Sequence, residues 1–316
     1  MSTPLIETVH LTKYFKTPRG MLHAVDDVNF RIERGQTIGV VGESGCGKST
    51  LGRVILRLIP HTSGQVLYDG ENILDYKESK MKEMRRKMQI IFQDPYASLN
   101  PRMSVRELIA EPIKVCRTIT NSREREEKVT ELMRTVGLAE RFDNSYPHEL
   151  DGGRRQRIGV ARALSVDPEF IVCDEPVSAL DVSIQAQILN LLMDLQDQRG
   201  LTYLFITHDL SVVRHISTNI MVMYLGQCVE YAPTEELFVR HLHPYTNALL
   251  SAIPIPSIRP EDRMKNVVKG EVTSPIEPEP GCRFAARCPH ASAACRGQNI
   301  PLKEVAPNHF VACTLF

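Results

Sequence analysis

The segment 42–49 limits the possible folds more than any other part of the chain, because it reads Gly-Glu-Ser-Gly-Cys-Gly-Lys-Ser. A short apolar run, 37–41, precedes it, and apolar residues at helical spacing follow it up to residue 58. In such a strand-loop-helix unit, glycines let backbone N–H groups turn toward phosphate oxygens. The lysine neutralises phosphate charge, and the serine hydroxyl ligates Mg²⁺. The residues predicted to bind a nucleoside triphosphate are Gly42, Glu43, Ser44, Gly45, Cys46, Gly47, Lys48, Ser49 and Thr50.

Composition and charge favour a cytoplasmic protein of about two domains. The 316 residues correspond to roughly two domains of ~150 residues each. Acidic and basic residues number 38 each, so the net charge gives no indication of a nucleic-acid or anionic-membrane partner. Apolar runs stay short of the ~18 residues that span a membrane, and the first ten residues lack the pattern of a signal peptide. The eight cysteines are therefore expected to be reduced thiols or metal ligands.

Apolar strand patterns alternate with amphipathic helix patterns, which predicts an α/β fold on a largely parallel sheet. The strongest strand predictions are 37–41, 88–92, 170–173 and 203–206. The strongest helix predictions are 121–137, with Asn121 as a possible N-cap, and 182–199, closed by Gly200. The charge run 77–87 is interpreted as a solvated helix face, and 97–160 as a mainly helical insert.

An acidic pair follows the apolar strand 170–173, as a phosphate loop requires. Asp174 is predicted to complete the Mg²⁺ shell, and Glu175 to orient or deprotonate the attacking water. Taken alone, the pair is equally compatible with a solvated strand end, and the loop upstream favours the catalytic interpretation. The lysine and aspartate element that accompanies guanine specificity is missing, so adenine is the expected base.

The ordered set of motifs resembles the ATP-binding-cassette (ABC) ATPases, and within them the ATPase subunit of a peptide importer. The resemblance spans residues 8 to about 252, and its dipeptide and oligopeptide features are the runs 94–101 and 243–246. It implies a RecA-like phosphate-loop core with an antiparallel β subdomain and a helical subdomain, about 97–160. It also implies a boundary between a nucleotide-binding domain, 1–252, and a small irregular cysteine-rich extension, 253–316. Beyond the phosphate loop, the matching segments are 90–95, 150–157, 174–175, 178–181 and 206–209.

The resemblance also implies roles for single residues, each with a plainer alternative. Gln93 corresponds to the glutamine that reaches Mg²⁺ or the lytic water, although a lone Gln usually caps a strand. His208 corresponds to the histidine that donates to the γ-phosphate, the alternative being a histidine satisfied within the fold. Phe15 corresponds to the aromatic stacked on adenine, with Tyr14 as its neighbour and core packing as the alternative for either. Asp181 corresponds to a residue at the dimer interface, and its context also predicts a helix N-cap.

The signature segment departs from the family pattern at two of its five positions, Asp151 and Arg154, where the family has Ser and Gln. In such proteins this segment contacts the γ-phosphate held by the opposite subunit. Two negative charges ~4 Å apart repel by roughly 4 kcal/mol at an effective dielectric near 20. N-capping by the aspartate and the positive charge of Arg154, Arg155 and Arg157 oppose that effect. We hypothesise one intact and one altered half-site in a heterodimer. The segment comprises Leu150, Asp151, Gly152, Gly153 and Arg154.

The chain changes character after residue 252. The proline-rich run 253–281 is expected to be an extended connection across a surface. Four cysteines follow without the paired spacing of common zinc sites, and a disulfide is unfavourable in a reducing cytosol. The family resemblance implies a [4Fe-4S] cluster, with zinc and no metal as alternatives. The proposed ligands are Cys282, Cys288, Cys295 and Cys313, while Cys46, Cys116, Cys173 and Cys228 are expected to be small core residues.

Together these features imply an ATPase at the cytoplasmic face of the cell membrane. Two ATP molecules are expected between this subunit and a second ABC ATPase, with Mg²⁺ held through Ser49, Gln93 and Asp174 and hydrolysis by Glu175. The expected partners are two membrane permease subunits and an extracellular solute-binding protein, and the expected cargo is di- or oligopeptides. Nickel or another small solute is the alternative cargo.

Two other classes of protein compete with this interpretation. A non-transport cassette ATPase of translation or DNA maintenance usually carries two cassettes or long coiled-coil insertions, and neither pattern is present in the sequence. A nucleotide-dependent regulatory protein with little turnover is compatible with the altered signature. Stimulation of ATP hydrolysis by membrane partners distinguishes the importer from both.

Overall fold

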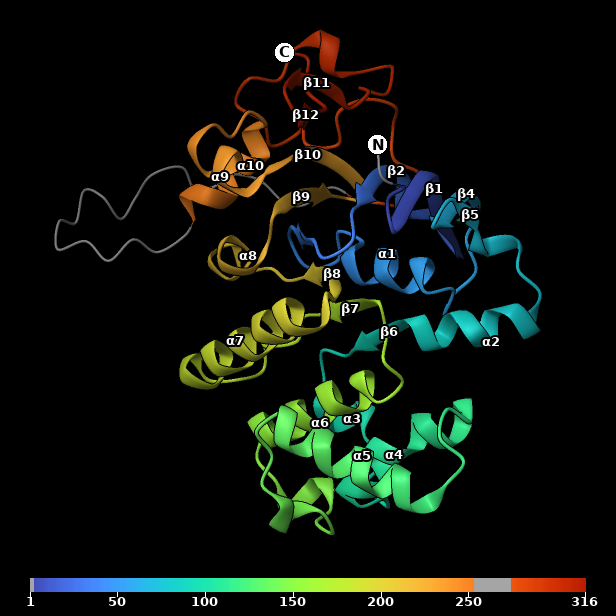
Figure 1. Ribbon diagram of the computed structural model, residues 1–316. Coiled ribbons are helices and arrows are strands. Elements are labelled where there is room, and N and C mark those ends of the chain that lie inside the picture. The colour runs from blue at the N-terminus through green and yellow to red at the C-terminus, as the bar shows by residue number, and fades with distance from the viewer. Residues whose placement is uncertain (1–2, 253–273) are drawn as a thin grey trace, which may run out of the picture. The chain divides into compact units, whose positions relative to one another are not determined.

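A computed structural model describes residues 3–252 and 274–316, and the chain divides into two compact units. The first unit contains Met1–Ile32, Thr37–Leu74 and Thr207–Phe316. The second contains Glu33–Gln36 and Asp75–Ile206. Figure 1 labels their elements along the chain. Residues 253–273 lie outside the described part, so most of the predicted extended connection does too.

The first unit contains an antiparallel sheet in the order β2-β1-β4-β5. Its two long strands, β1 (Ile6–Thr17) and β2 (Gly20–Ile32), form a hairpin, and β4 (Ser63–Tyr68) pairs with the other side of β1. The short strand β5 (Glu71–Asn72) completes the sheet. An antiparallel β region was implied by the family resemblance, and the structure confirms it.

Five further strands of the first unit pair in the order β11-β12-β10-β9-β3. The fully buried β3 (Thr37–Val41) pairs in parallel with β9 (Asn219–Tyr224). The remaining pairs are antiparallel and add β10 (Gln227–Pro233), β12 (His309–Val311) and β11 (Lys303–Ala306). The end of the cysteine-rich segment is thus part of the sheet. The α-helices of this unit are α1 (Lys48–Ile55), α8 (Leu210–Ile216), α9 (Thr234–Val239) and α10 (Pro244–Ser251).

A buried ion pair joins the C-terminal hairpin, formed by β11 and β12, to β10. The Glu230 carboxylate accepts a hydrogen bond from His309 Nε2 at 2.8 Å, and both side chains are inaccessible to solvent. The same carboxylate accepts the backbone N–H groups of Leu242 and His243, which lead into α10. The hydrogen bond to Glu230 raises the pKa of His309, with Glu236 at 3.5 Å adding to the effect.

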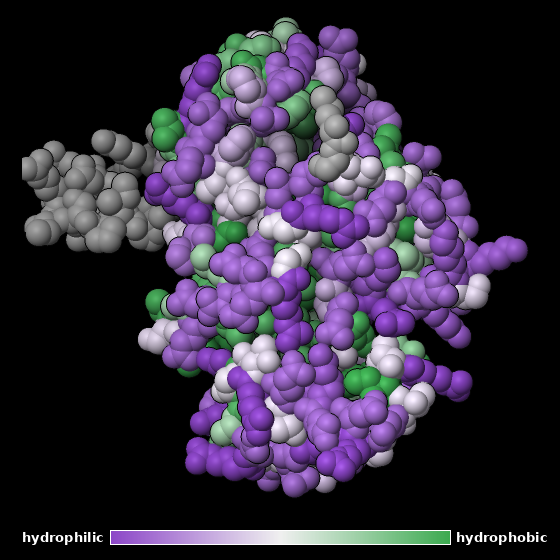
Figure 2. All heavy atoms as spheres, in the orientation of Figure 1, coloured by the Kyte–Doolittle hydropathy of each residue, from purple (hydrophilic) through white to green (hydrophobic). Residues whose placement is uncertain are grey.

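The second unit combines a parallel sheet with a group of helices. Its strands β6 (Met88–Ile91), β7 (Phe170–Asp174) and β8 (Thr202–Ile206) pair in parallel. In Figure 1, α3 to α6 gather on one side of these strands, with α6 against β6, and their visible face is mostly hydrophilic in Figure 2. Its α-helices are α2 (Glu78–Lys87), α3 (Pro95–Ser98), α4 (Val105–Cys116), α5 (Ser122–Thr135), α6 (Gly152–Leu164) and α7 (Val182–Arg199). Short 3-10 turns lie at Glu140–Phe142 and Pro147–Glu149 in this unit, at Ala293–Cys295 in the first unit, and at Ile73–Asp75 where the chain passes from the first unit to the second.

Each element predicted from local patterns is present, although three of them end early: β6 at Ile91, α5 at Thr135 and α1 at Ile55. Asn121 caps α5 by accepting the N–H of Arg123, and Gly200 ends α7 with φ of 65°. The charge run is α2, which buries only its two methionines. The helix after the phosphate loop stops at Ile55, three residues before the predicted end at residue 58. The chain leaves the helix there because Arg57 adopts a left-handed conformation, with φ of 53°.

Candidate nucleotide site

The phosphate loop lies in the first unit, and two of its glycines are required by close backbone neighbours. A Cβ on Gly47 would lie 1.9 Å from the carbonyl oxygen of Ala24, and one on Gly42 2.2 Å from that of Met223. Both glycines also have positive φ, 105° and 152°. The loop is therefore packed against strands on two sides, and its shape excludes larger residues at these positions.

Lys48 crosses the loop and contacts its first two residues. Its Nζ donates to the carbonyl oxygens of Gly42 at 2.8 Å and Glu43 at 3.0 Å, and the side chain is buried. Lys48 is also the first residue of α1, and its N-cap, Gly47, has no side chain with which to cap the helix. The first-turn N–H groups and the lysine together form the positive end that a phosphate needs.

His208 is tied to the strand that enters this loop. The N–H of Thr207 donates to the carbonyl of Val40, at the end of β3, at 3.1 Å. After the histidine, Asp209 starts α8 by accepting the N–H of Ser211 at 2.8 Å. These two contacts fix the backbone on either side of His208, whose side chain is exposed. The structure therefore keeps His208 near the strand end from which the loop begins.

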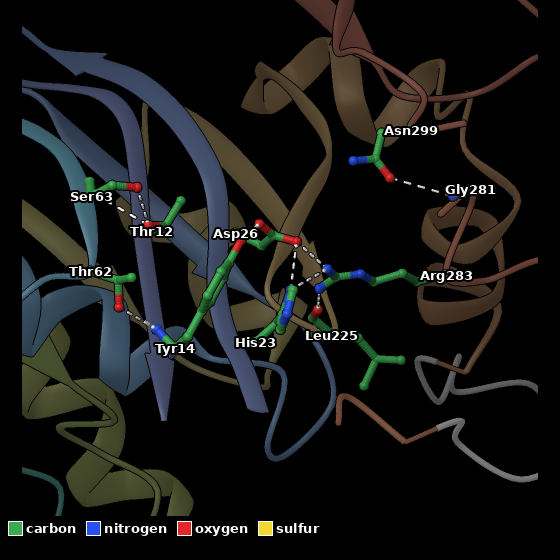
Figure 3. Close-up of polar contacts among 10 residues, drawn as sticks. All are labelled: Thr12, Tyr14, His23, Asp26, Thr62, Ser63, Leu225, Gly281, Arg283 and Asn299. Carbon is green, nitrogen blue, oxygen red and sulfur yellow. Dashed lines mark hydrogen bonds and ion pairs between the residues drawn. The ribbon is translucent and has the colours of Figure 1, made fainter. Parts of the chain in front are cut away.

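The two aromatic candidates for stacking on adenine are separated by their contacts. Tyr14 stacks on His23 with ring centroids 3.8 Å apart, and its hydroxyl donates to Asp26 (Figure 3). Burial and this carboxylate raise the pKa of Tyr14. Phe15, the next residue on β1, is contacted by Lys13, whose Nζ lies 4.6 Å from the ring centroid. Tyr14 is thus engaged within the protein, which leaves Phe15 as the candidate for adenine.

The acidic residues of the predicted nucleotide site, Asp174 and Glu175, lie in the second unit. Asp174 ends β7 and is almost completely buried. Glu175 then adopts a left-handed conformation, with φ of 48°, while its N–H donates to the carbonyl of Ile206 at 2.9 Å. Gln93 Nε2 donates to Glu175 Oε2 at 2.9 Å. Two residues predicted to handle the lytic water are therefore in contact, although they are 82 positions apart.

In the signature segment, Asp151 caps α6 and is paired with a charge. Its Oδ1 accepts the N–H of Arg154 at 2.8 Å, and its Oδ2 accepts Arg154 Nη1 at 2.7 Å. Gly153 lets the helix approach α7, since a Cβ there would lie 2.7 Å from Ile184 Cγ2. Asp181 caps α7 in the same way, accepting the N–H of Ile184 at 2.9 Å. Both predictions of an N-cap are confirmed.

Of the three arginines expected to place positive charge near Asp151, Arg154 is in contact with the carboxylate, and the other two have different partners. Arg155 is buried, and its guanidinium lies 3.5 Å from the ring centroid of Tyr96. Arg157 donates to the carbonyl of Val136 and to Gln187. Packing within the helical group occupies both side chains, so Arg154 alone is paired with the Asp151 carboxylate.

The four cysteines of the C-terminal segment line one small cavity. His243 borders the same cavity, and burial lowers its pKa to about 4, which keeps its ring neutral. Its Nδ1 accepts the N–H of Tyr245 at 3.1 Å, so Nε2 carries the hydrogen and has no partner among the described residues. Within 3–252 and 274–316, no three potential ligands lie close enough to hold a single metal ion. The lining cysteines are Cys282, Cys288, Cys295 and Cys313.

Two contacts of the phosphate loop were missed in the sequence. Glu43 forms a bidentate ion pair with Arg287 of the cysteine-rich segment, at 2.8 and 2.9 Å. Its backbone N–H donates to the Tyr245 hydroxyl at 2.8 Å. The run 243–246 carried a signal, because it belongs to the peptide-importer resemblance, but it does not reveal a contact with residue 43. The ion pair joins residues 244 positions apart, and no local pattern indicates it.

Among the described residues, none of the helices combines the length and apolar character needed to cross a lipid bilayer.

Comparisons with known proteins agree with the geometry of the site. Residues 25–178 match the family described as ABC transporter, and residues 229–295 match the oligopeptide/dipeptide transporter C-terminal region. The oligopeptide transport ATP-binding protein OppF of Bacillus subtilis (strain 168) is 52% identical over 99% of this chain and 97% of its own length. The dipeptide transport ATP-binding protein DppF of Haemophilus influenzae is 49% identical, again over 99% and 97%.

A solved structure extends the similarity to the fold. It is the dimeric post-hydrolysis state of the ATP-binding cassette MJ0796 bound to ADP and Pi. It aligns with a TM-score of 0.67 at 30% identity and covers 72% of this chain and 98% of that one.

Proposed function

We propose, since the chain belongs to the ABC transporter family and to its oligopeptide and dipeptide branch, that it hydrolyses ATP to power the import of di- or oligopeptides. The observation that carries this proposal is the identity of about half of all residues, along nearly the full length, with oligopeptide transport ATP-binding proteins. The intact phosphate loop and the contact between Gln93 and Glu175 support the capacity for hydrolysis.

The residues have distinct roles in this proposal. The phosphate loop and Lys48 bind the β- and γ-phosphates of ATP, and Mg²⁺ is held through Ser49, Gln93 and Asp174. Glu175 accepts a proton from the attacking water, and Gln93 holds the Glu175 carboxylate in place. His208 donates to the γ-phosphate, and Phe15 stacks on adenine. The domain division at residues 252 and 253 is part of the same proposal.

The partners follow from the same branch of the family. A second, related ABC ATPase supplies the signature helix that closes this chain's ATP, as the dimeric form of the similar cassette suggests. Two permease subunits carry the solute across the membrane, with this chain on the cytoplasmic face, and a solute-binding protein delivers it from outside. No role for nucleic acid is proposed.

The reconstituted complex tests this function. ATP hydrolysis by the full chain, together with the second ATPase and the permease subunits, is expected to rise when the solute-binding protein and a di- or oligopeptide are added. Stimulation by nickel instead of peptide would redirect the proposal to a metal importer. Hydrolysis that is indifferent to membrane partners, with no co-purification, would favour a non-transport ATPase.

We further propose that the cavity of four cysteines holds a [4Fe-4S] cluster. The four thiolates of such a cluster bind different iron atoms and do not converge on one point. The absence of a compact single-ion site among the described residues is therefore compatible with a cluster. The His243 Nε2–H, which borders the cavity without a partner in the described chain, suits a sulfide or thiolate acceptor. Bound there, the cluster would supply a one-electron centre and a crosslink of the segment.

Metal analysis after anaerobic purification tests the cluster. The wild-type chain is expected to contain about four iron and four acid-labile sulfide per chain. Cys288→Ser is expected to lose most of both, because one of four thiolate ligands is removed. Cys116→Ser, outside the segment, is the matched control and is expected to keep them. Stoichiometric zinc, or no metal in the wild-type chain, would contradict the proposal.

A further inference from the structure

Glu43, the second residue of the phosphate loop, is held from three directions by parts of the first unit. Its N–H donates to the Tyr245 hydroxyl at 2.8 Å, and its carbonyl accepts Lys48 Nζ at 3.0 Å. Its carboxylate accepts two parallel bonds from Arg287, at 2.8 and 2.9 Å. Any displacement of Glu43 would therefore also displace an acceptor of the lysine that binds phosphate.

Arg287 is itself fixed by an aromatic cluster. Its Nη1 donates to the Tyr224 hydroxyl at 3.3 Å, and only 6% of its side chain is exposed. Phe284, three residues earlier, is buried against Tyr224 and Tyr245, with ring centroids 5.3 Å apart in both pairs. The planar guanidinium is thus oriented before it meets the carboxylate, which favours the bidentate geometry.

The charge of Glu43 explains why such a partner is needed. A carboxylate in a loop that binds a triphosphate has the same sign as its ligand, and it is also a competing acceptor for Lys48. The fork of Arg287 neutralises that carboxylate and directs it toward the C-terminal segment. Without Arg287, the carboxylate would be left partly buried and unpaired beside the phosphates.

A second arginine of the same segment contacts β2, the strand that pairs with β1, on which the adenine candidate Phe15 lies. Figure 3 shows Arg283 reaching the carboxylate of Asp26 and the carbonyl of Leu225, with His23 beside it. Asp26 also accepts the hydroxyl of Tyr14, which precedes Phe15 on β1. The segment thus contacts the phosphate loop directly, and it reaches the neighbour of Phe15 only through Asp26.

We infer that the C-terminal segment, 274–316, positions the phosphate loop for ATP, and that Arg287 is the positioning residue that holds Glu43. The inference rests on the proposed function in one respect, namely that the loop binds ATP. Nothing in it requires a metal in the cysteine cavity.

Binding of ATP with Mg²⁺ to the full chain, measured by calorimetry, tests the inference. Arg287→Ala is expected to weaken binding by about tenfold or more, because one partner of a partly buried, bidentate charge pair is removed. Turnover at saturating ATP in the assembled complex is expected to stay within about twofold, since Arg287 contributes to binding rather than to the hydrolytic step. Arg31→Ala is the control: it breaks an exposed ion pair with Glu7 on the same unit and is expected to leave binding unchanged.

A double-mutant cycle separates positioning from general packing. In a Glu43→Gln background the carboxylate is gone, so Arg287→Ala is expected to have little further effect. Arg287→Lys keeps the positive charge but cannot form the two parallel hydrogen bonds to Glu43, so it is expected to bind ATP with intermediate affinity. If Arg287→Ala fails to fold, Arg287→Lys replaces it in the binding measurement. Wild-type affinity in Arg287→Ala, or the same loss in both backgrounds, would overturn the inference. A wild-type chain that fails to bind ATP would overturn the proposed function, and the inference with it.

Discussion

Glu175→Gln is expected to lower the rate of ATP hydrolysis by about a hundredfold to ten-thousandfold while leaving ATP binding intact. The amide keeps the size of the carboxylate and still offers an oxygen to Gln93 Nε2, which lies 2.9 Å from Glu175 Oε2. It cannot accept the proton of the attacking water, however. Hydrolysis should therefore fail at the chemical step, and bound ATP should accumulate.

Single-turnover hydrolysis and retention of radiolabelled ATP in the assembled complex measure the two effects. Asp197→Asn is a matched control, because it makes the same change in an exposed side chain of α7 in the same unit. The control is expected to hydrolyse ATP at the wild-type rate. A Glu175→Gln variant that retains more than about a tenth of wild-type turnover would assign the base to another residue.

Features governed by neighbours in sequence could be predicted from the sequence. The strand before the phosphate loop needs only an apolar run, and the N-caps Asp151 and Asp181 need only an acceptor three residues before a free N–H. The left-handed turn at Gly200 follows from the glycine itself. These rules act over a few residues, and the structure agrees with them.

Contacts between distant segments could not be predicted, even where one partner, Glu43, lay in a recognised motif. Arg283 and Asp26 are 257 positions apart, and Arg287 and Glu43 are 244 apart. Arg155 shows the same limit at short range, because the sequence does not indicate that its guanidinium packs on the ring of Tyr96. The partner of a charged side chain depends on tertiary packing, which the order of residues does not reveal without a fold.

The altered signature leads to the second large effect. Asp151→Ser combined with Arg154→Gln is expected to raise ATP turnover, by about three- to tenfold, at the composite site that this helix closes. A bare carboxylate ~4 Å from the γ-phosphate costs roughly 4 kcal/mol at an effective dielectric near 20. Arg154 offsets part of that repulsion through its 2.7 Å contact, but both side chains are about half exposed, so solvent weakens the offset. Serine is also a good N-cap, so α6 should remain intact.

Three variants assign the effect to charge or to the hydroxyl. Asp151→Asn removes the charge and keeps a cap, so it should recover the part of the gain that comes from repulsion. Asp151→Ser adds the hydroxyl donor, and the double variant also removes the guanidinium that would otherwise lose its carboxylate partner. Turnover is measured in two preparations of the complex with the second ATPase. Glu175→Gln in this chain leaves only the site that this helix closes, and inactivation of the equivalent glutamate in the second ATPase leaves only the other site. An unchanged or lower rate in the double variant would mean that Asp151 and Arg154 together replace the usual serine and glutamine, and that neither half-site is impaired.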